Sequence, residues 1–211
     1  MMQLITSDCY GEFADELAAM HRLRHRVFKE RLEWDIQTSG DMEVDEFDAL
    51  HPAYLLLRGE DRQVRGCVRF VPTTGPTMLR DVFPTLLGGL PAPSNPAIWE
   101  SSRFALDLDG GPSSTSRGLA GATFELFAAM IEFGLAHGLT DIVTVTDARL
   151  ERILRRAAWP LRRISEPQPL GKTLTVAGYL EVSVDCLARV RAAGGLKGPV
   201  LWAPVVQRTA A

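Results

Sequence analysis

The stretch IWESSRFALD, residues 98–107, alternates like a β-strand but carries Glu100 and Arg103 inside an otherwise apolar segment. Side chains two residues apart lie on one face of a strand, so Glu100 would share a face with Ser102, and Arg103 with Ser101. A β-bulge would let the acid and the arginine converge, and bulges are frequent beside active sites. Because fully buried charges need partners, these two should meet other charges in a polar cluster or open onto a cleft.

Regular elements are predicted on the N-terminal side of this strand. The segments 2–6, 53–58 and 64–72 read as strands, and residues 12–29 as an amphipathic helix. The acidic stretch 30–52 is long for a connector, and its apolar anchors indicate an ordered, functional loop. Residues 75–84 read as a short helical piece that ends at Pro84.

Helices and strands alternate on the C-terminal side. The apolar segment 117–137 predicts a buried helix closed by Gly138, and 148–159 an amphipathic helix stopped by Pro160. Strands are predicted at 141–147, 171–183 and 199–206, with a helix at 184–193. Together these elements predict an α/β or α+β three-layer sandwich, with a largely antiparallel mixed sheet and helices on both faces.

Length and composition limit the class of protein. The 211 residues suit one domain, with 46% hydrophobic and 23% charged residues, as in ordinary soluble proteins. The net charge of −3 provides no general attraction to nucleic acid or anionic membrane. Three widely spaced cysteines without a CxxC pair fit a reducing cytoplasm and predict no metal site. Neither a signal peptide nor a membrane span is predicted.

Charged side chains interrupt the local pattern in four segments. The residues concerned are Arg24, Asp45, Asp48, Arg69, Glu100 and Arg103. They should meet in a polar cluster or open onto a cleft, because unpaired charges are rarely buried. One interpretation is an architectural salt-bridge network. The other is a cleft for a zwitterionic substrate, in which carboxylates hold a cationic group, arginines hold a carboxylate, and one acid acts as a base.

These segments resemble one family, the acyl-homoserine-lactone synthases of the LuxI type. The resemblance rests on RLRHRVFKERLEWD, DEFD, VRGCVRFVPT and ESSRFALD in the first half of the chain, and more loosely on IVTVTDARLERILRRAAW in the second. It implies a fold like that of GNAT N-acetyltransferases. It also implies that an acyl thioester acylates the amino group of S-adenosylmethionine, after which the product lactonises and expels methylthioadenosine. S-adenosylmethionine is then a substrate, and no cofactor is expected.

The resemblance also implies roles for individual residues. Glu100, Arg103, Arg69, Asp45 and Asp48 would form the catalytic group, with Glu100 as the base, directly or through a water. The S-adenosylmethionine pocket would be formed by Arg24, Phe28, Trp34, Asp45, Asp48 and Arg103. Whether Arg69 and Arg103 bind the substrate carboxylate or hold the acids in position stays open, and both aromatic residues could be plain core.

The acyl chain and its carrier would be bound mainly by the second half. The predicted acyl pocket comprises Met78, Leu79, Phe104, Leu126, Met130, Val143, Thr144, Val145 and Leu174. In this family a threonine near Thr144 tends to accompany 3-oxo acyl chains. The stretch RGLAGA from Arg117 weakly matches the phosphate-binding loop of GNAT enzymes.

Six arginines follow the strand at 141–147 and predict a docking face for acidic acyl carrier protein or for the phosphates of coenzyme A. They are Arg149, Arg152, Arg155, Arg156, Arg162 and Arg163. A solvated helix face is the alternative interpretation. We expect one domain, 1–211, with 1–110 binding S-adenosylmethionine and 111–211 binding the acyl chain and its carrier. A GNAT-type transferase acting on another amine, and a non-catalytic module, are the competing hypotheses.

Overall fold

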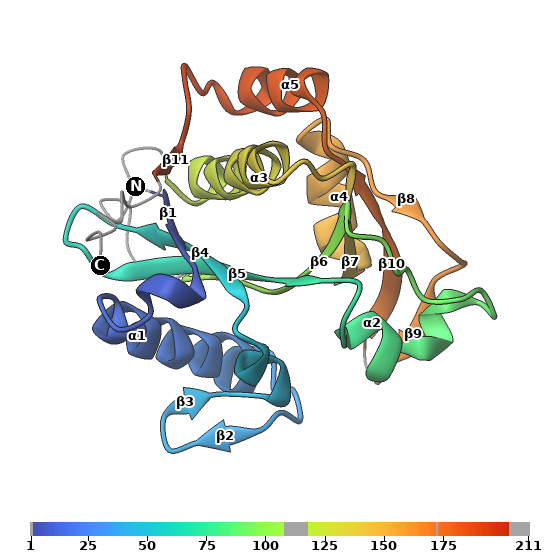
Figure 1. Cartoon of the computed structure of the whole chain (residues 1–211), viewed down its shortest axis with the longest axis horizontal. Coiled ribbons are helices and arrows are strands. Elements are labelled where there is room, and N and C mark those ends of the chain that lie inside the picture. Colours follow the sequence, from blue (N-terminus) through green and yellow to red (C-terminus); the bar gives the residue numbers. More distant parts are fainter. Residues whose placement is uncertain (1, 108–117, 172, 203–211) are drawn as a thin grey trace, which may run out of the picture.

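A computed structural model describes residues 2–107, 118–171 and 173–202 of the chain (Figure 1). Within these residues, nine strands form one twisted sheet in the order β11-β1-β4-β5-β6-β7-β10-β8, with β9 paired to β10. Its strands are β1 (Met2–Ile5), β4 (Ala53–Arg58), β5 (Val64–Pro72), β6 (Ile98–Leu106), β7 (Asp141–Asp147), β8 (Arg162–Arg163), β9 (Gln168–Leu170), β10 (Thr173–Glu181) and β11 (Leu201–Trp202).

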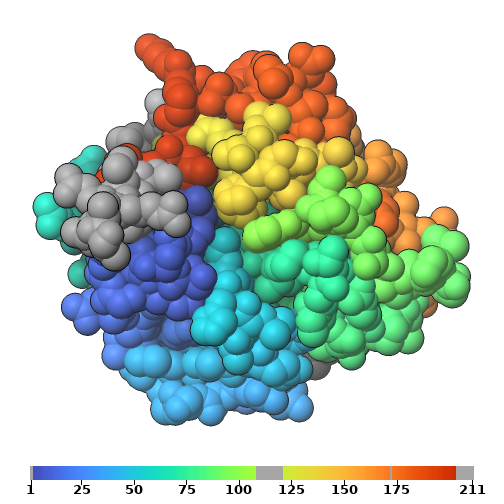
Figure 2. Space-filling model, in the orientation of Figure 1, coloured from blue at the N-terminus to red at the C-terminus, as the bar shows by residue number. Residues whose placement is uncertain are grey.

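Helices cover both faces of this sheet. The α-helices are α1 (Ala14–Arg24), α2 (Met78–Asp81), α3 (Gly118–Ala136), α4 (Ala148–Arg156) and α5 (Val184–Gly194). Helices α1 and α2 lie below the sheet in Figure 1, and α3 and α5 lie above it. In Figure 2 the blue N-terminal part and the yellow and orange-red parts lie on opposite sides of the molecule. The predicted three-layer sandwich is confirmed.

Strand pairing is antiparallel except at two places. Strand β1 pairs in parallel with β11, and β6 pairs in parallel with β7. The β6–β7 register runs from Ile98 opposite Asp141 to Ser101 opposite Thr144 and goes no further, although both strands continue. The two strands therefore separate about halfway along their length, and Arg103 lies two residues beyond the last paired residue of β6.

Alternation along β5 and β6 sorts their side chains between two cores. Val68, Phe70 and Leu106 lie with α3, whereas Cys67 and Ala105 lie with α1. Helix α3 is apolar on nearly all sides because it is enclosed by the sheet and α5. Glycines permit this close packing: a Cβ on Gly134 would lie 2.9 Å from Val182.

Several predicted boundaries were wrong. The helix expected at 12–29 is α1 followed by a π-helix, His25–Arg31. The stretch 30–52 is ordered, as expected, but it contains unpredicted short elements: the hairpin β2 (Thr38–Ser39) and β3 (Met42–Glu43), and a 3₁₀ helix, Glu46–Leu50.

Near Pro84 the expected helix end was also misplaced. Helix α2 ends at Asp81, and Pro84 begins a separate 3₁₀ helix, Pro84–Leu87, because proline suits a first helical position. Short 3₁₀ structure also occurs at Ser7–Cys9. Strands β8 and β9 were not predicted. The strand expected at 199–206 is described only as Leu201–Trp202, and its remaining residues lie outside the described part of the chain.

Candidate active site

A bulge in β6 turns Arg103 toward the face that carries Glu100. Cys67 pairs with Ala105 and Arg69 with Ser102, so Arg103 and its neighbour both lie opposite the single residue between them on β5. Arg103 has φ of 54°, a left-handed conformation that is unfavourable for a residue with a side chain. The bulge that would let Glu100 and Arg103 converge is present, and it places the guanidinium on the α1 side of the sheet.

Arginines and carboxylates alternate around a closed ring on that side. We call this set of residues the charge ring; in order of contact they are Arg24, Glu43, Arg103, Asp45, Arg69 and Asp48, with Asp48 returning to Arg24. All six side chains are buried or nearly so. Three positive and three negative charges cancel within the ring, so the hydration lost on burial is replaced by charge-assisted hydrogen bonds.

Arginine geometry sets the shape of the charge ring. Arg24 donates to both oxygens of Asp48, at 2.8 and 2.9 Å, and also pairs with Glu43. Arg103 donates from Nε to Glu43 at 2.9 Å and from Nη2 to Asp45 at 2.8 Å. Each guanidinium thus bridges two carboxylates, which its planar fork of donors makes possible.

Local structure fixes the two aspartates before any arginine reaches them. Asp45 is the N-cap of the 3₁₀ helix Glu46–Leu50, and its side chain accepts from the backbone N–H of Phe47 and Asp48. Asp48 accepts in return from the N–H of Asp45 at 2.9 Å, which completes a capping box. Tyr54 on β4 donates to Asp48 at 2.7 Å.

The charges in the ring hold one another ionised. Burial alone would raise the pKa of Asp48, but hydrogen bonds and charge from Arg24, with the charge of Arg69, hold that pKa well below its usual range. Burial would lower the pKa of Arg69, yet Asp45 and Asp48 outweigh burial and raise it. For Arg103 burial dominates, and its pKa is lowered.

Aromatic rings extend the site from the charge ring toward solvent. The Arg103 guanidinium lies over the ring of Phe28, 5.6 Å from its centroid. Phe28 stacks on Trp34 with centroids 5.1 Å apart and planes inclined by 13°. Phe28 is buried in the π-helix, whereas Trp34 is 41% exposed. The column therefore leads from a buried cation to an exposed indole surface. Both aromatic residues could have been plain core residues. Phe28 is buried like a core residue, whereas Trp34 is too exposed to be one.

Glu100 lies beside the charge ring without joining it. Its two carboxylate oxygens accept the backbone N–H groups of Met78 and Leu79, each at 2.8 Å. Burial raises the pKa of Glu100 to about 7, against the lowering effect of these hydrogen bonds and of Arg69. A carboxylate with this pKa can exchange a proton near neutral pH.

Sequence reasoning missed three members of the site. Glu43 is fully buried and links Arg24 to Arg103. Ser102 accepts from Nε of Arg69 at 3.0 Å, and Tyr54 holds Asp48. The alternation of Glu43 with Asp45, two residues apart in a short extended segment, was the available signal for the missing carboxylate.

The predicted acyl-pocket residues do not share one face of the sheet. Leu79, Val143 and Val145 belong to the cluster between the sheet and the 3₁₀ helix at Pro84. Phe104, Leu126 and Met130 belong to the core under α3. Met78 is buried at the start of α2, whereas Leu174 is 50% exposed. Residues of the two groups lie near each other where the β6–β7 pairing ends: Val143 precedes Thr144 on β7, and Phe104 follows Ser101 on β6.

Thr144 occupies the last position at which β7 pairs with β6. Its hydroxyl donates to the Ser101 carbonyl at 3.0 Å, across the parallel pair. This bond uses the only proton that the hydroxyl can donate. A hydrogen bond from Thr144 to a 3-oxo group would therefore have to replace it.

All six arginines of the predicted docking face are exposed. Arg163 forms a bidentate pair with Glu151 at 2.7 and 2.8 Å, and Arg162 pairs with Asp141 at 2.9 Å. The other four lie on α4 and form no ion pair with the described residues: Arg149, Arg152, Arg155 and Arg156. Arg117, the first residue of the weak phosphate-loop match, lies outside the described residues.

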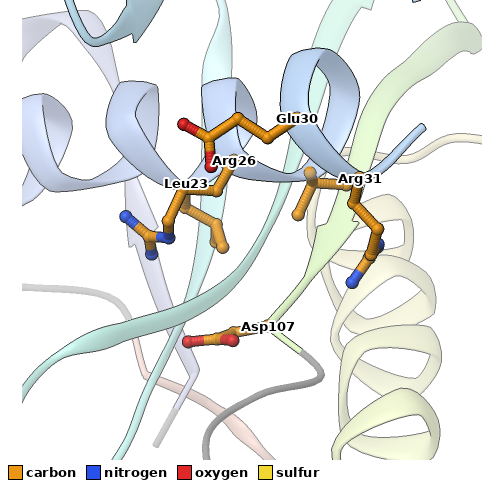
Figure 3. A pocket seen from close by; sticks show the side chains of 6 residues that line it. Leu23, Arg26, Glu30, Arg31 and Asp107 are labelled. Atoms are coloured by element: carbon orange, nitrogen blue, oxygen red, sulfur yellow. The ribbon is translucent and has the colours of Figure 1, made fainter. Parts of the chain in front are cut away.

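A surface cavity of about 230 Å³ lies beside the π-helix (Figure 3). Its lining comprises Leu23, Arg26, Val27, Glu30, Arg31 and Asp107. No charge-ring residue lines it, so it does not extend the site. Among the described residues there is no cluster of three or more potential metal ligands. No helix within the described ranges is long and apolar enough to cross a bilayer.

Known proteins resemble this chain along most of its length. The family profile described as autoinducer synthase matches residues 10–190. An acyl-homoserine-lactone synthase of Agrobacterium fabrum is 45% identical over 178 residues, which are 83% of this chain and 83% of that protein. The structure of a CoA-dependent acyl-homoserine lactone synthase, BjaI, with SAM and isopentyl-CoA has a TM-score of 0.86 at 27% identity, covering 97% of this chain and 93% of that one.

The fold is shared more widely than the sequence. A protein from Lactobacillus plantarum described as an N-acetyltransferase superposes with a TM-score of 0.57 at 16% identity, covering 86% of this chain and 99% of that one. This likeness concerns the fold alone and confirms the expected GNAT-like architecture. From the profile match and the close relative, the protein is an acyltransferase that makes an acyl-homoserine-lactone autoinducer for quorum sensing, and the chain belongs to the autoinducer synthase family.

Proposed function

We propose that Glu100 and the charge ring carry out amide synthesis on S-adenosylmethionine, and that the same site then directs lactone formation. The observation that supports this most strongly is the position of Glu100, a buried carboxylate that two backbone N–H groups hold near Arg69, with no ion pair among the described residues.

In the first step the α-amino nitrogen attacks the thioester carbonyl. An α-ammonium group has a pKa of about 7.7–8.0, so at pH 7 most of the substrate must lose a proton first. Glu100 takes that proton, directly or through a water. The C–N bond forms, the C–S bond of the thioester breaks, and the carrier leaves as a thiol. Backbone N–H groups at the Arg103 bulge are the donors we assign to the developing oxyanion.

In the second step the substrate's carboxylate oxygen attacks the methylene carbon bonded to sulfur. That C–S bond breaks, and its electron pair neutralises the sulfonium, so that methylthioadenosine leaves without needing a proton. Because the sulfonium is a good leaving group, this step depends mainly on holding the chain folded for ring closure.

The charge ring gives the site both signs of charge for a zwitterionic cation. We assign the carboxylates of Asp45 and Asp48 to the ammonium and sulfonium side, and Arg24 and Arg103 to the substrate carboxylate. Every one of these groups already has a partner in the ring. Charged groups of the substrate would therefore replace ion pairs within the ring. The exposed face of Trp34, beyond Phe28, is suited to contact the adenine or the sulfonium.

The acyl chain is assigned to the region where β6 and β7 part. Beyond Ser101 and Thr144 the two strands no longer pair, and apolar residues of both sheet faces approach this point. Val143 and Leu79 would line it from one side, and Phe104 from the other. Leu174, which is half exposed, would lie at the outer end.

For the donor we propose a phosphopantetheine thioester, carried by acyl carrier protein or coenzyme A. The CoA-dependent relative supports the second carrier by similarity. The four exposed arginines of α4 support either, because both carriers present anionic groups. Three free, buried cysteines agree with synthesis in the reducing cytoplasm, where we place the protein.

The test is to incubate the purified protein with S-adenosylmethionine and a panel of acyl donors on both carriers. Mass spectrometry would then follow methylthioadenosine and the lactone. Equal amounts of both products confirm the coupled reaction, and the best donor identifies the acyl chain. An acylated amine formed without methylthioadenosine release would instead favour a transferase for another amine.

A further inference from the structure

Met78 touches Glu100 and the charge ring at once. Its backbone N–H donates to Glu100 Oε1 at 2.8 Å. Its thioether sulfur lies 3.3 Å from Nη2 of Arg69 and 3.4 Å from Nη1 of Arg103, and accepts a hydrogen bond from each. The residue is 8% exposed and lies at the first position of α2. One residue therefore contacts both guanidinium groups through its side chain and Glu100 through its backbone.

The sulfur meets a nitrogen without a carboxylate partner on Arg103 and a nitrogen shared with one carboxylate on Arg69. Arg103 uses Nε for Glu43 and Nη2 for Asp45, which leaves Nη1 for Met78. Arg69 uses Nε for Ser102 and Nη1 for both aspartates, and its Nη2 is shared between Asp45 and Met78. Thioether sulfur is a weak, uncharged acceptor, so it occupies these donors without adding charge.

Glu100 is surrounded by few other charges. Arg69 approaches from β5 and Asp81 from α2, and Val143 lies opposite Glu100 on β7. Arg103 lies three residues further along β6 itself. Across the described residues Glu100 has no ion pair within 4.0 Å, although Arg69 and Arg103 both reach the methionine that holds it.

We propose that Met78 is a positioning residue, whose side chain keeps Arg69 and Arg103 from pairing with Glu100 and so preserves Glu100 as an available base. This inference rests on the proposed role of Glu100. An arginine that moved into contact with the carboxylate would lower its pKa by about 1–3 pH units and occupy the oxygen that must accept the proton. In this proposal the bulk of the side chain separates the groups, and the sulfur adds only weak, uncharged hydrogen bonds to the two arginines.

The test is a ¹³C NMR titration of the Glu100 carboxyl in substrate-free protein labelled at glutamate, with Glu100→Gln to assign the signal. Met78→Ala should lower the Glu100 pKa by at least about 1 pH unit, toward the value of an arginine-paired carboxylate. Met78→Leu should keep the wild-type value, because a leucine Cδ takes the position of the sulfur. Met78→Val, a smaller truncation, gives the same reading if the alanine variant does not fold.

Leu79→Ala is the matched control. Leu79 also lies in the first turn of α2 and also donates its N–H to Glu100, but among the described residues its side chain accepts no hydrogen bond from an arginine. An unchanged Glu100 pKa in both Met78→Ala and Met78→Val overturns the proposal. Equal shifts in Met78→Leu and Met78→Ala, or in Leu79→Ala and Met78→Ala, also overturn it, because they assign the effect to sulfur or to loosening of α2. The titration needs no turnover, so it stands apart from the test of the reaction itself.

Discussion

Glu43 accepts a hydrogen bond of 2.9 Å from Nε of Arg103, although the two residues are 60 positions apart in the chain. The Glu43 side chain is fully buried, and that of Arg103 is 10% exposed. Glu43 also pairs with Arg24 on α1. One carboxylate thereby joins the helix layer to the bulged strand and fixes the arginine that the bulge redirects.

Glu43→Gln should destabilise the protein by about 3–5 kcal/mol, because it leaves a buried excess of positive charge in the ring. Urea unfolding would measure the change. Asp41→Asn is the control: Asp41 pairs with Arg22, but its side chain is 71% exposed, so a loss of about 1 kcal/mol or less is expected. Similar small losses in both variants would show that water, and not Glu43, compensates the arginines.

Glu100→Gln should preserve the fold and reduce turnover by about 10²–10⁴-fold, the usual contribution of a general base. The matched control is Glu132→Gln. Glu132 on α3 likewise accepts backbone N–H groups, those of Val200 and Leu201, and pairs with Arg191. It should lose stability with little change in kcat. A near-normal rate for Glu100→Gln would contradict the general-base assignment.

Activity should rise with pH through about 7, because Glu100 must be ionised to accept a proton and burial raises its pKa to about 7. The substrate ammonium adds its own rise near pH 8. Comparing kcat/KM profiles separates the two: Glu100→Gln should keep only the upper rise. If the wild type and this variant have the same profile shape, Glu100 does not control the reaction.

The same raised pKa has an opposite effect on stability. Folded protein binds the Glu100 proton more tightly than unfolded chain does, so the stabilisation is complete below about pH 4.5 and is lost as pH rises to about 7. The loss from this one group is about 3 kcal/mol at most. It should appear as a slope in the difference between wild-type and Glu100→Gln unfolding free energies, and a flat difference would contradict the raised pKa.

The sequence was sufficient for the elements whose pattern is local. Strands β4, β5 and β6 lie where alternation and β-branched residues predicted them, and the mismatch of Glu100 and Arg103 pointed to the place where a bulge could occur. The π-helix left no such sign, because a single widened turn does not alter the apolar period enough. Strands β8 and β9 are too short to show alternation.

Most residues of the charge ring could be predicted from the sequence, but the ion pairs between them could not. Five of the six ring residues stood out as charges in apolar or ordered segments, whereas Glu43 was hidden in an acidic run. Which acid meets which arginine depends on the capping box at Asp45 and on contacts across the sheet. Likewise, Val143 and Val145 share one face of the sheet and Thr144 lies between them on the other, which residue type alone does not reveal.

The exposed arginines of α4 should matter for the carrier and not for the chemistry. Replacing Arg152, Arg155 and Arg156 together by glutamate should raise KM for an acyl carrier protein donor by about 10-fold or more at low salt, with little change in kcat, because steering by surface charge acts on association. High salt should shrink the difference, since exposed charges are screened.

The control makes the same change of net charge at exposed positions elsewhere, with glutamate at Arg62, Arg189 and Lys197. If α4 is the dock, this control variant keeps a nearly wild-type KM for the carrier protein. Repeating both assays with acyl-coenzyme A shows whether the same face attracts its phosphates. Equal effects of the two triple variants would mean that net charge alone acts, and the arginines would then be an ordinary solvated helix face.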